Sequence, residues 1–430
     1  MYEMAKKYIQ KKLEGYVTQY FANHPNVRLI VVTGSVGKTS TKRAIATLLN
    51  ERYKVRMHDG NQNTEMSVPF GILGIKYPEN IRSISAWREV FKMAEQRVSE
   101  QGDTDIIIQE LGTDKPGDVA SFGRYLRPHL AVITAVTPEH MEFFGTIEEV
   151  AKEEMSVSGY SQFALINRDD VEGRFAVYEQ NPNFSTYGTS GAAEYKFEIQ
   201  DHDPETGYIV NVFGPEFPQA FMARIRVLGE HSLRPVAGAM AVAAKMGLTP
   251  QEVVSGMTKV LPVPGRMSLL KGIGGTMVID DSYNSSPAAA EAAMRTLYSF
   301  DQAPQRIALL GDMRELGVTS QYEHDKLGAM CDPNMVSWVV TVGPESEKYL
   351  APRARQRGCS VKSFRSAIEA GAFVRSVSEE GGVILVKGSQ NTIYLEEAVK
   401  VLVDYSEDVK LVRQTPQWVK TKSDFFSNFS

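Results

Sequence analysis

The chain has 430 residues, of which 43% are hydrophobic and 23% are charged, and its formal net charge is −5. These values are typical of a folded globular protein, exclude a strongly basic nucleic-acid binder, and predict two or three domains. Two cysteines cannot build a disulfide framework, and no apolar run reaches the roughly 20 residues that span a bilayer. We therefore expect a cytoplasmic protein with small-molecule partners, no nucleic acid and no transmembrane segment.

Residues 1–24 carry apolar side chains at helical spacing, with lysines over much of the other face. The segment lacks the apolar centre of a signal peptide. It is predicted to form one helix that docks on the domain that follows.

A glycine-rich turn follows the apolar run Leu29–Val32 and leads into a helix-forming segment. Backbone N–H groups in such a turn, together with the positive end of a helix, bind phosphate. Lys38 adds a cation, and Thr39 or Ser40 adds a hydroxyl for Mg²⁺. An ordinary strand-to-helix turn has similar spacing, but the flanking strand and helix favour a nucleotide site. The predicted nucleotide-binding residues are Gly34, Ser35, Val36, Gly37, Lys38, Thr39 and Ser40.

The strand before this turn, at residues 28–33, is the first of four, and the others are expected at 105–110, 130–136 and 163–167. They alternate with helices, which is typical of a parallel sheet. Glu110 ends one of these strands, and His140 follows another. Ligands of open parallel sheets bind beyond the carboxyl ends of the strands. We therefore expect the glycine-rich loop, Glu110 and His140 to converge on one bound nucleotide.

Residues 195–227 alternate with a period of two, which predicts an antiparallel excursion on the same domain. A helix around Pro235–Met246 follows. A second helix begins at a capping box formed by Thr249 and Glu252 and ends near Val260.

From Arg266 the alternation of strands and helices begins again and predicts a second α/β domain. The fold class is therefore α/β, with a central P-loop parallel-sheet domain, a small antiparallel excursion and a C-terminal Rossmann-like domain. The expected boundaries are an N-terminal helix (1–24), a central ATP-binding domain (25–262), a C-terminal domain (263–408) and a tail (409–430). Strands are expected at 276–281, 306–310, 338–342 and 383–386, with helices reaching Phe300 and starting at Gln321, Ala367 and Leu395.

Several stretches resemble the Mur ligase family, most closely its MurF branch. They are TGSVGKTST, GNQNTEMSVPFGIL, ELGTDKPGDVA, RPHLAVITAVTPEHMEFFGTIEEVAKEE, VPGRM, IDDSYNSSP, LLGDMRELG and LVKGSQ, in the order of the family. The resemblance implies ATP-dependent amide ligation: ATP phosphorylates a carboxylate, and an amine then displaces phosphate. The resemblance implies a role in cell-wall precursor synthesis, with ATP and Mg²⁺ as cofactors.

The resemblance also implies roles for individual residues. Lys38 and Mg²⁺ would neutralise the transferring phosphoryl group, and Thr39 with Glu110 would hold the first Mg²⁺. His140 would help to hold a second metal. Taken alone, Glu110 fits a capping or solvent-facing carboxylate equally well. His140 taken alone fits a surface or packing histidine better than a metal ligand.

Residues in the second domain are implied to bind nucleotide or substrate. Arg266, Asp281 and Asn284 would contact the nucleotide. Lys387 and Ser389 would bind a substrate carboxylate, although Ser389 also fits a simple turn. In the central domain, Asn63 is the third predicted substrate-binding residue.

One departure from the family pattern concerns the second metal. The family places a carbamylated lysine fourteen residues after the metal histidine, where this chain has Glu154. We predict that the Glu154 carboxylate takes its place as a catalytic and metal-site group, and that Lys152 points elsewhere. A helix-surface acid is the alternative for Glu154.

Other departures leave the substrate open. Only residues 1–27 precede the loop strand, so no MurF-type UDP-sugar domain is expected. Ala135, Ser232 and Pro235 stand where the family has asparagines, and Gln390 replaces an arginine that would clamp a carboxylate.

Two alternative functions remain. One is a ligase that polymerises or conjugates amino acids, in the manner of cyanophycin, poly-γ-glutamate or folylpolyglutamate synthetases. The other is an inactive nucleotide-binding regulator or scaffold of an active paralogue. The oligomeric state is not readable, and a monomer is favoured.

Overall fold

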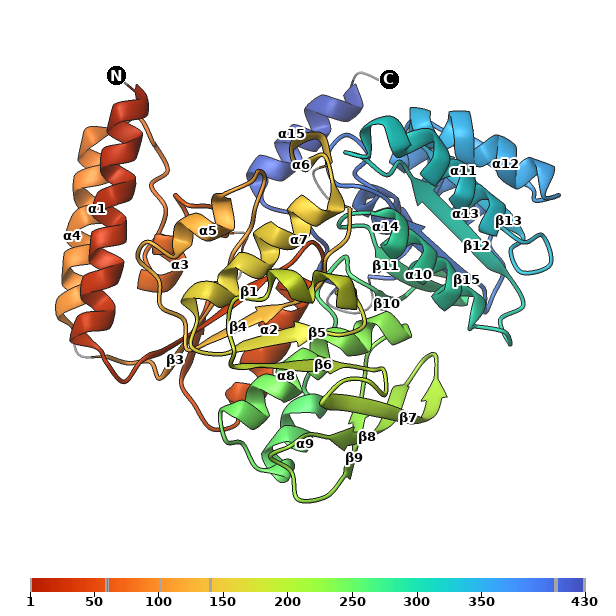
Figure 1. Ribbon diagram of the computed structural model, residues 1–430. Coiled ribbons are helices and arrows are strands. Elements are labelled where there is room, and N and C mark those ends of the chain that lie inside the picture. The colour runs from red at the N-terminus through yellow and green to blue at the C-terminus, as the bar shows by residue number, and fades with distance from the viewer. Residues whose placement is uncertain are drawn as a thin grey trace. The chain divides into compact units, whose positions relative to one another are not determined.

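The computed structural model describes residues 2–58, 60, 62–100, 102–138, 141–405 and 409–427 (Figure 1). Its internal contacts divide the chain into two compact units. The N-terminal unit comprises Met1–Asp201, Tyr208–Arg226 and Leu233–Val260, and the C-terminal unit comprises His202–Gly207, Val227–Ser232 and Leu261–Ser430. No helix in the described ranges is long and apolar enough to cross a membrane.

The N-terminal unit is built on one sheet whose strand order is β2-β3-β1-β4-β5-β6-β7-β8-β9. Strands β1 to β6 pair in parallel, β7 continues in parallel with β6, and β8 pairs with β9 antiparallel. The strands are β1 (Arg28–Thr33), β2 (Val55–Met57), β3 (Ile106–Glu110), β4 (Leu130–Ile133), β5 (Ala164–Asn167), β6 (Phe184–Gly188), β7 (Tyr195–Asp203), β8 (Gly207–Phe213) and β9 (Phe221–Ile225). The predicted parallel sheet with an antiparallel excursion is confirmed.

The two parts of this sheet differ in burial, and their patterns of apolar residues differ accordingly. Strands β1, β3, β4 and β5 are buried along nearly their whole length and are continuous apolar runs. Strand β8 alternates between buried and partly buried positions, as expected for a strand with one covered face.

Helices cover the central strands of this unit. They are α1 (Tyr2–Asn23), α2 (Lys38–Leu49), α3 (Val68–Leu73), α4 (Ile84–Ser99), α5 (Asp118–Phe122), α6 (Met141–Phe144), α7 (Ile147–Met155), α8 (Leu233–Lys245) and α9 (Pro250–Thr258), with 3₁₀ turns at Ser156–Tyr160 and Gly173–Tyr178. The Thr249–Glu252 capping box at the start of α9 is present as predicted.

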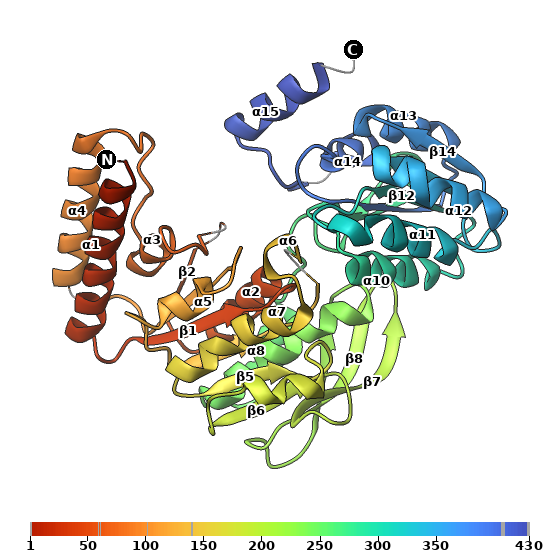
Figure 2. The ribbon, with the colours of Figure 1, turned by 45° about the horizontal axis from the view of Figure 1, so that its top comes forward.

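The N-terminal helix α1 lies beside α4 in both views (Figures 1 and 2). Leu13 of α1 packs with Trp87 and Val90 of α4 in one buried cluster. The Asn23 amide donates to the Val98 carbonyl at 3.0 Å, so the two helices end at the same level. The predicted docking of the first helix on its own domain is therefore observed, whereas α4 itself was not predicted.

The C-terminal unit contains a second sheet of order β10-β11-β15-β12-β13-β14, in which only the β10–β11 pair is antiparallel among the described strands. Its strands are β10 (Ser268–Lys271), β11 (Met277–Asp281), β12 (Arg306–Gly311), β13 (Trp338–Val342), β14 (Val361–Phe364) and β15 (Val383–Lys387). Its α-helices are α10 (Pro287–Tyr298), α11 (Ser320–Met330), α12 (Ala351–Gln356), α13 (Ala367–Val377), α14 (Glu396–Leu402) and α15 (Pro416–Phe426). Short turns of 3₁₀ or π type lie at Glu230–Ser232, Ile273–Gly275, Gly317–Thr319 and Ser346–Leu350.

Each face of this second sheet carries its own apolar layer. Ile279 and Leu385 point into one layer, with α10 and α11, while Val278 and Ile384 point into the other, with α13 and α14. Neighbouring residues along β11 and β15 thus face opposite layers, as the strand period requires. The predicted Rossmann-like character of this region is confirmed.

Candidate nucleotide-binding site

The glycine-rich loop requires its first glycine for steric reasons. Gly34 has φ of 125°, and a Cβ added there would lie 2.3 Å from Thr134 Oγ1 and 2.7 Å from the Ala135 nitrogen. Gly37 also has positive φ, at 86°, and provides no side-chain cap for α2, which begins at Lys38. The first N–H groups of α2 are therefore not capped by that residue, as an anion site requires.

The segment after β4 holds the loop in place. Ser35 donates its N–H to the Ala135 carbonyl at 2.9 Å, and its hydroxyl accepts from the Thr137 N–H at 3.0 Å. Thr134 donates to the Val36 carbonyl at 2.6 Å. The contact at Ala135 uses only backbone, so the absence of the family's asparagine side chain does not remove it.

Lys38 lies against the loop that it follows. Its Nζ donates to the Gly34 carbonyl at 2.5 Å and to the Ser35 carbonyl at 3.2 Å, and the side chain is half-buried. A cation is therefore positioned at the loop. Its predicted contact with phosphate stays a prediction.

The register of the sheet brings Glu110 to the same place. Val32 of β1 pairs with Glu110 of β3, so the carboxylate stands beside the start of the loop. Thr39 Oγ1 donates to Glu110 Oε2 at 3.1 Å, and the Asn63 amide donates to Oε1 at 3.2 Å. The structure thus brings together Thr39, Glu110 and Asn63, three residues predicted from the sequence.

A residue that sequence reasoning missed completes this group. Lys42 Nζ lies 3.3 Å from Glu110 Oε2, and the two side chains are 2% and 4% exposed. Lys42 stands one helical turn after Lys38, so its position four residues later was the signal that could have found it.

Thr39 and Glu110 fit Mg²⁺ chemically. Both offer hard oxygen donors, and Mg²⁺ in nucleotide sites keeps several waters and takes one or two protein ligands together with phosphate oxygens. Across the described parts of the chain, no three His, Cys, Asp or Glu residues form a group that could hold a metal by themselves. A site shared with phosphate is consistent with that finding.

Glu154 points inward from α7. Its Oε2 accepts hydrogen bonds from the Thr33 hydroxyl and, at 2.8 Å, from the Gly34 N–H, and the residue is 1% exposed. Lys152 is exposed, as helical geometry requires for a residue two positions away. The expected orientation is therefore observed. Because His140 lies outside the described residues, the joint metal role of Glu154 and His140 stays a prediction.

In the C-terminal unit, the DSYN and KGS motifs meet at neighbouring strand ends. Asp281 of β11 pairs in register with Lys387 of β15, and their charged groups form an ion pair of 2.7 Å. Lys387 Nζ also donates to the Asn284 carbonyl at 2.8 Å. Asp281 Oδ1 accepts from the Met267 N–H at 3.2 Å, which ties the VPGRM segment to the same point.

The other predicted residues of this unit join the same group. Ser389 Oγ donates to the Ser285 carbonyl at 3.1 Å, and the Gln390 N–H donates to Asn284 Oδ1 at 3.3 Å. Lys387 and Ser389 are each 2% exposed. Both hold the DSYN loop here, and their predicted contact with a substrate carboxylate stays a prediction, as does that of Asn63.

Arg266 contacts the DSYN loop through an aromatic ring. Its guanidinium lies 4.2 Å from the centre of the Tyr283 ring, a cation–π distance. Asn284, in the same loop, is exposed. Both residues are thus placed by the loop, although no nucleotide contact is tested.

Two buried carboxylates near these motifs have raised pKa values. Burial, followed by repulsion from Asp281 and Glu396, raises the pKa of Asp280 to about 6. Burial also raises the pKa of Asp312, although the N–H groups of Ser346 and Glu345 donate to it. In both cases loss of solvent outweighs the hydrogen bonds.

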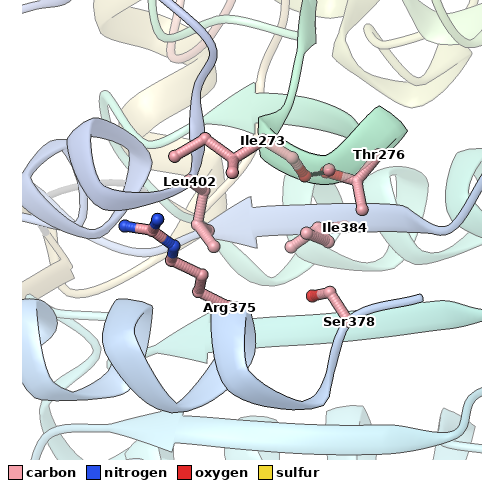
Figure 3. A pocket seen from close by; sticks show the side chains of 7 residues that line it. Ile273, Thr276, Arg375, Ser378, Ile384 and Leu402 are labelled. Carbon is pink, nitrogen blue, oxygen red and sulfur yellow. Dashed lines mark hydrogen bonds between the residues drawn. The ribbon is translucent and has the colours of Figure 1, made fainter. Parts of the chain in front are cut away.

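The C-terminal unit also contains a cavity (Figure 3). Its volume is about 130 Å³, smaller than the roughly 300 Å³ at which ligand pockets begin. Thr276 precedes β11 and Ile384 lies near the start of β15, so the cavity is at the opposite ends of the strands from Asp281 and Lys387. It is lined by Ile273, Gly274, Thr276, Arg375, Ser378, Ile384 and Leu402.

A glycine-rich loop between a parallel strand and a helix, with a carboxylate at the next strand end, defines a nucleotide-binding protein of P-loop type. Comparison with known proteins agrees. The Mur ligase middle domain matches residues 32–243, and the Mur ligase glutamate ligase domain matches residues 265–390. The chain belongs to the Mur ligase family.

Two relatives that match this chain share one name. The UDP-N-acetylmuramoyl-tripeptide–D-alanyl-D-alanine ligase of Bacillus subtilis is 28% identical over 390 residues, covering 88% of this chain and 76% of that protein. The Escherichia coli ligase of the same name is 26% identical over 391 residues, with 87% and 76% covered. The structure of MurF ligase from Thermotoga maritima in complex with ADP matches with a TM-score of 0.72 at 22% identity, covering 91% of this chain and 83% of that one. The predicted class, an ATP-dependent carbon–nitrogen ligase, is therefore confirmed.

Proposed function

We propose that this ligase joins a peptide or amino-acid carboxylate to the amine of an amino acid or dipeptide in the synthesis of a cell-wall precursor. The observation that carries the proposal is the convergence of Lys38, Thr39 and Glu110 at one glycine-rich loop. The named relatives support the substrate class, since their names specify a muramoyl tripeptide and D-alanyl-D-alanine.

The residues of the N-terminal unit account for the first half-reaction. The N–H groups at the start of α2 and the Lys38 ammonium bind the nucleotide phosphates, while Ser35 keeps the loop fixed to the segment after β4. An oxygen of the substrate carboxylate bonds to the terminal phosphorus of ATP, and the bond from that phosphorus to the bridging oxygen of ADP breaks. Lys38 offsets the negative charge where the two anions meet.

Thr39 and Glu110 would hold Mg²⁺, which supplies further neutralisation of phosphate charge when bound. In the second half-reaction, the amine nitrogen bonds to the carbonyl carbon of the acyl phosphate. The carbon–oxygen bond to phosphate breaks, phosphate leaves, and the amine gives up a proton.

The test measures ADP release and product mass with purified protein, ATP and Mg²⁺. UDP-muramoyl tripeptide with D-alanyl-D-alanine is compared with glutamate, with aspartate and arginine, and with a folate acceptor plus glutamate. We expect ligation of the muramoyl acceptor. Lys38→Ala should lower that rate by at least about 10²-fold without unfolding the protein, the scale of removing one preorganised transition-state contact.

Each other outcome has a defined meaning. Turnover with the amino-acid or folate substrates, but not with the muramoyl acceptor, would indicate a polymerising or conjugating ligase instead. ATP binding without turnover on any acceptor would indicate a regulatory paralogue. Near-normal ligation by folded Lys38→Ala protein would remove the role assigned to the loop.

A further inference from the structure

The segment at the end of the chain folds back onto the C-terminal unit. The family match ends at residue 390, and the described segment 409–427, here called the tail, lies beyond it. Helix α15 lies within the tail and appears in blue in Figure 1. Tyr394 contacts the rings of Trp418, Phe425 and Phe426 at 6.5, 5.2 and 6.2 Å, so the helix is docked by aromatic packing.

A buried ion cluster adds to this packing. Glu396 at the start of α14 is 0% exposed. Arg413 donates to it through both fork positions, Nε to Oε1 at 2.8 Å and Nη2 to Oε2 at 2.7 Å. Lys422 of α15 lies 3.3 Å from the same Oε1 and 2.5 Å from Glu397 Oε1. The tail therefore supplies two cations to the fully buried Glu396, and one of them also pairs with Glu397, which Lys400 of α14 contacts at 3.0 Å as well.

Only one of the two cations reaches the DSYN loop in the contacts observed. Arg413 Nη1 donates to the Tyr283 carbonyl at 2.9 Å, and Nη2 donates to the Ser282 carbonyl at 3.0 Å. Its guanidinium also lies 5.5 Å from the centre of the Tyr283 ring. The planar fork of arginine can hold a carboxylate and two carbonyls together, which an ammonium group cannot do with the same geometry.

The backbone of the tail is adapted to this contact. Arg413 has φ of 52°, in the left-handed region that a non-glycine residue adopts at a cost. The preceding Val412 packs against the VPGRM turn, since a Cβ added at Gly265 would lie 2.8 Å from Val412 Cγ1. The tail thus touches both segments that carry predicted nucleotide-binding residues of this unit.

We propose that the tail is a clamp on the nucleotide-binding loop and that Arg413 is its positioning residue. The KGSQ segment holds Asn284 and Ser285 from one side through Lys387, Ser389 and Gln390. Arg413 holds Ser282 and Tyr283, so each residue from Ser282 to Ser285 accepts a hydrogen bond from one side or the other. This inference rests on the proposed function and on the predicted contact of this loop, through Asp281 and Asn284, with ATP.

The test compares two charge-removing variants of the full chain, Arg413→Met and Lys422→Met. Both remove a buried cation from Glu396, but only Arg413 contacts the loop in the hydrogen bonds observed. Binding of ADP with Mg²⁺ is measured by calorimetry, and KM for ATP is measured beside kcat. We expect Arg413→Met to weaken ADP binding and raise KM by about tenfold, the effect of roughly one charged hydrogen bond. Lys422→Met should change both by less than about twofold.

Arg413→Lys covers the case in which Arg413→Met does not fold. It keeps a cation for Glu396, and we expect an intermediate loss of affinity with a melting temperature close to that of the unchanged protein. Equal nucleotide affinity of unchanged and Arg413→Lys protein, or equal losses in Arg413→Met and Lys422→Met, would overturn the clamp. Failure of the unchanged protein to bind ADP would instead overturn the proposed function.

Discussion

At the scale of single residues, the contact between Lys42 and Glu110 has the clearest energetic consequence. Both side chains are almost fully buried, and their charged atoms are 3.3 Å apart. Removing one partner of a buried pair leaves the other charge without compensation, which typically costs 3–5 kcal/mol. Thr39 and Asn63 would still donate to the carboxylate, so the lower part of that range applies.

We therefore predict that Lys42→Met lowers the free energy of unfolding by about 3 kcal/mol in EDTA. Added Mg²⁺ should raise the melting temperature of the variant more than that of the unchanged protein, because the metal then supplies the missing positive charge. Thermal unfolding with and without Mg²⁺ measures both effects. Lys54→Met, at an exposed lysine of the same unit, is the control. An equal Mg²⁺-induced rise in melting temperature in all three proteins would show that Glu110 does not hold the metal.

Asp280 makes stability depend on pH. Its carboxyl is fully buried, and among the described residues its Oδ2 has no hydrogen-bond partner. Burial raises its pKa from 3.8 to about 6, so the folded chain holds the proton more tightly than the unfolded chain. Stability from this group is consequently full below about pH 4 and is lost as the pH rises through about 6.

Asp280→Asn should remove this dependence. We expect the variant to match the unchanged protein near pH 4 and to be more stable by about 3 kcal/mol at pH 7, the equivalent of two pKa units. Urea unfolding at pH 4, 5, 6 and 7 measures the difference, with the exposed Asp301→Asn as control. A difference that stays constant over this range would show that Asp280 does not titrate there.

Lys42 and Arg413 were not predicted, and both contact residues that lie far from them in the sequence. Thr39 and Glu110 could be predicted because each follows an apolar run at a recognisable distance. The parallel register of β1 and β3 then brings the two residues together. Lys42 looks like an ordinary helix-surface lysine until Glu110 is placed beside it. The Arg413 contacts depend on a tail that folds back onto residues distant in sequence, and no local pattern encodes that return.

At the scale of elements, three successive residues of α7 lie in different surroundings. Glu153 caps α5 by accepting from the N–H groups of Gly117 and Val119 at 2.7 and 2.6 Å. Glu154 reaches the Gly34 N–H, and Lys152 is exposed. Successive residues of a helix differ by about 100° in direction, so one helix can serve the scaffold, the loop and solvent.

This arrangement supports a prediction for the second metal. Glu154→Gln keeps an oxygen for Thr33 and Gly34 but loses the charge, so we expect a folded protein with ligation about 10- to 100-fold slower. Lys152→Gln should have little effect. Activity of the unchanged protein should not depend on bicarbonate, whereas Glu154→Lys should regain some activity when bicarbonate is supplied. Ligation rates measured with and without bicarbonate test this prediction. A loss of activity in Lys152→Gln but not in Glu154→Gln would assign the metal-site role to Lys152 instead of Glu154.

The predicted elements show which local signals suffice. Arg28–Thr33, Trp338–Val342 and the start of α13 at Ala367 agree with their predicted bounds, because each is a strongly periodic or continuous apolar segment. The expected strand 130–136 ends earlier, at Ile133, where the chain leaves the sheet to support the loop. Strands β2, β6, β10 and β14 were missed, since most are short and only partly buried.

At the scale of the whole molecule, the nucleotide motifs are divided between two units that each have their own sheet and core. The glycine-rich loop belongs to one unit, while Arg266, Asp281 and Asn284 belong to the other. If both sets contact ATP, neither unit alone provides full affinity.

We therefore predict that Asn284→Ala in the full chain weakens ATP binding by about tenfold, although the P-loop is unchanged. Asn334→Ala, at another exposed asparagine of the same unit, is the control and should bind as the unchanged protein does. The isolated segment 1–262 should also bind ATP more weakly than the full chain, with circular dichroism used to verify that it is folded. Asn284 is exposed, and its truncation removes the 3.3 Å hydrogen bond that its Oδ1 accepts from the Gln390 N–H. Weaker binding together with an unchanged melting temperature would therefore report a lost ligand contact. Equal affinity of all these proteins in calorimetry would confine the nucleotide to the N-terminal unit.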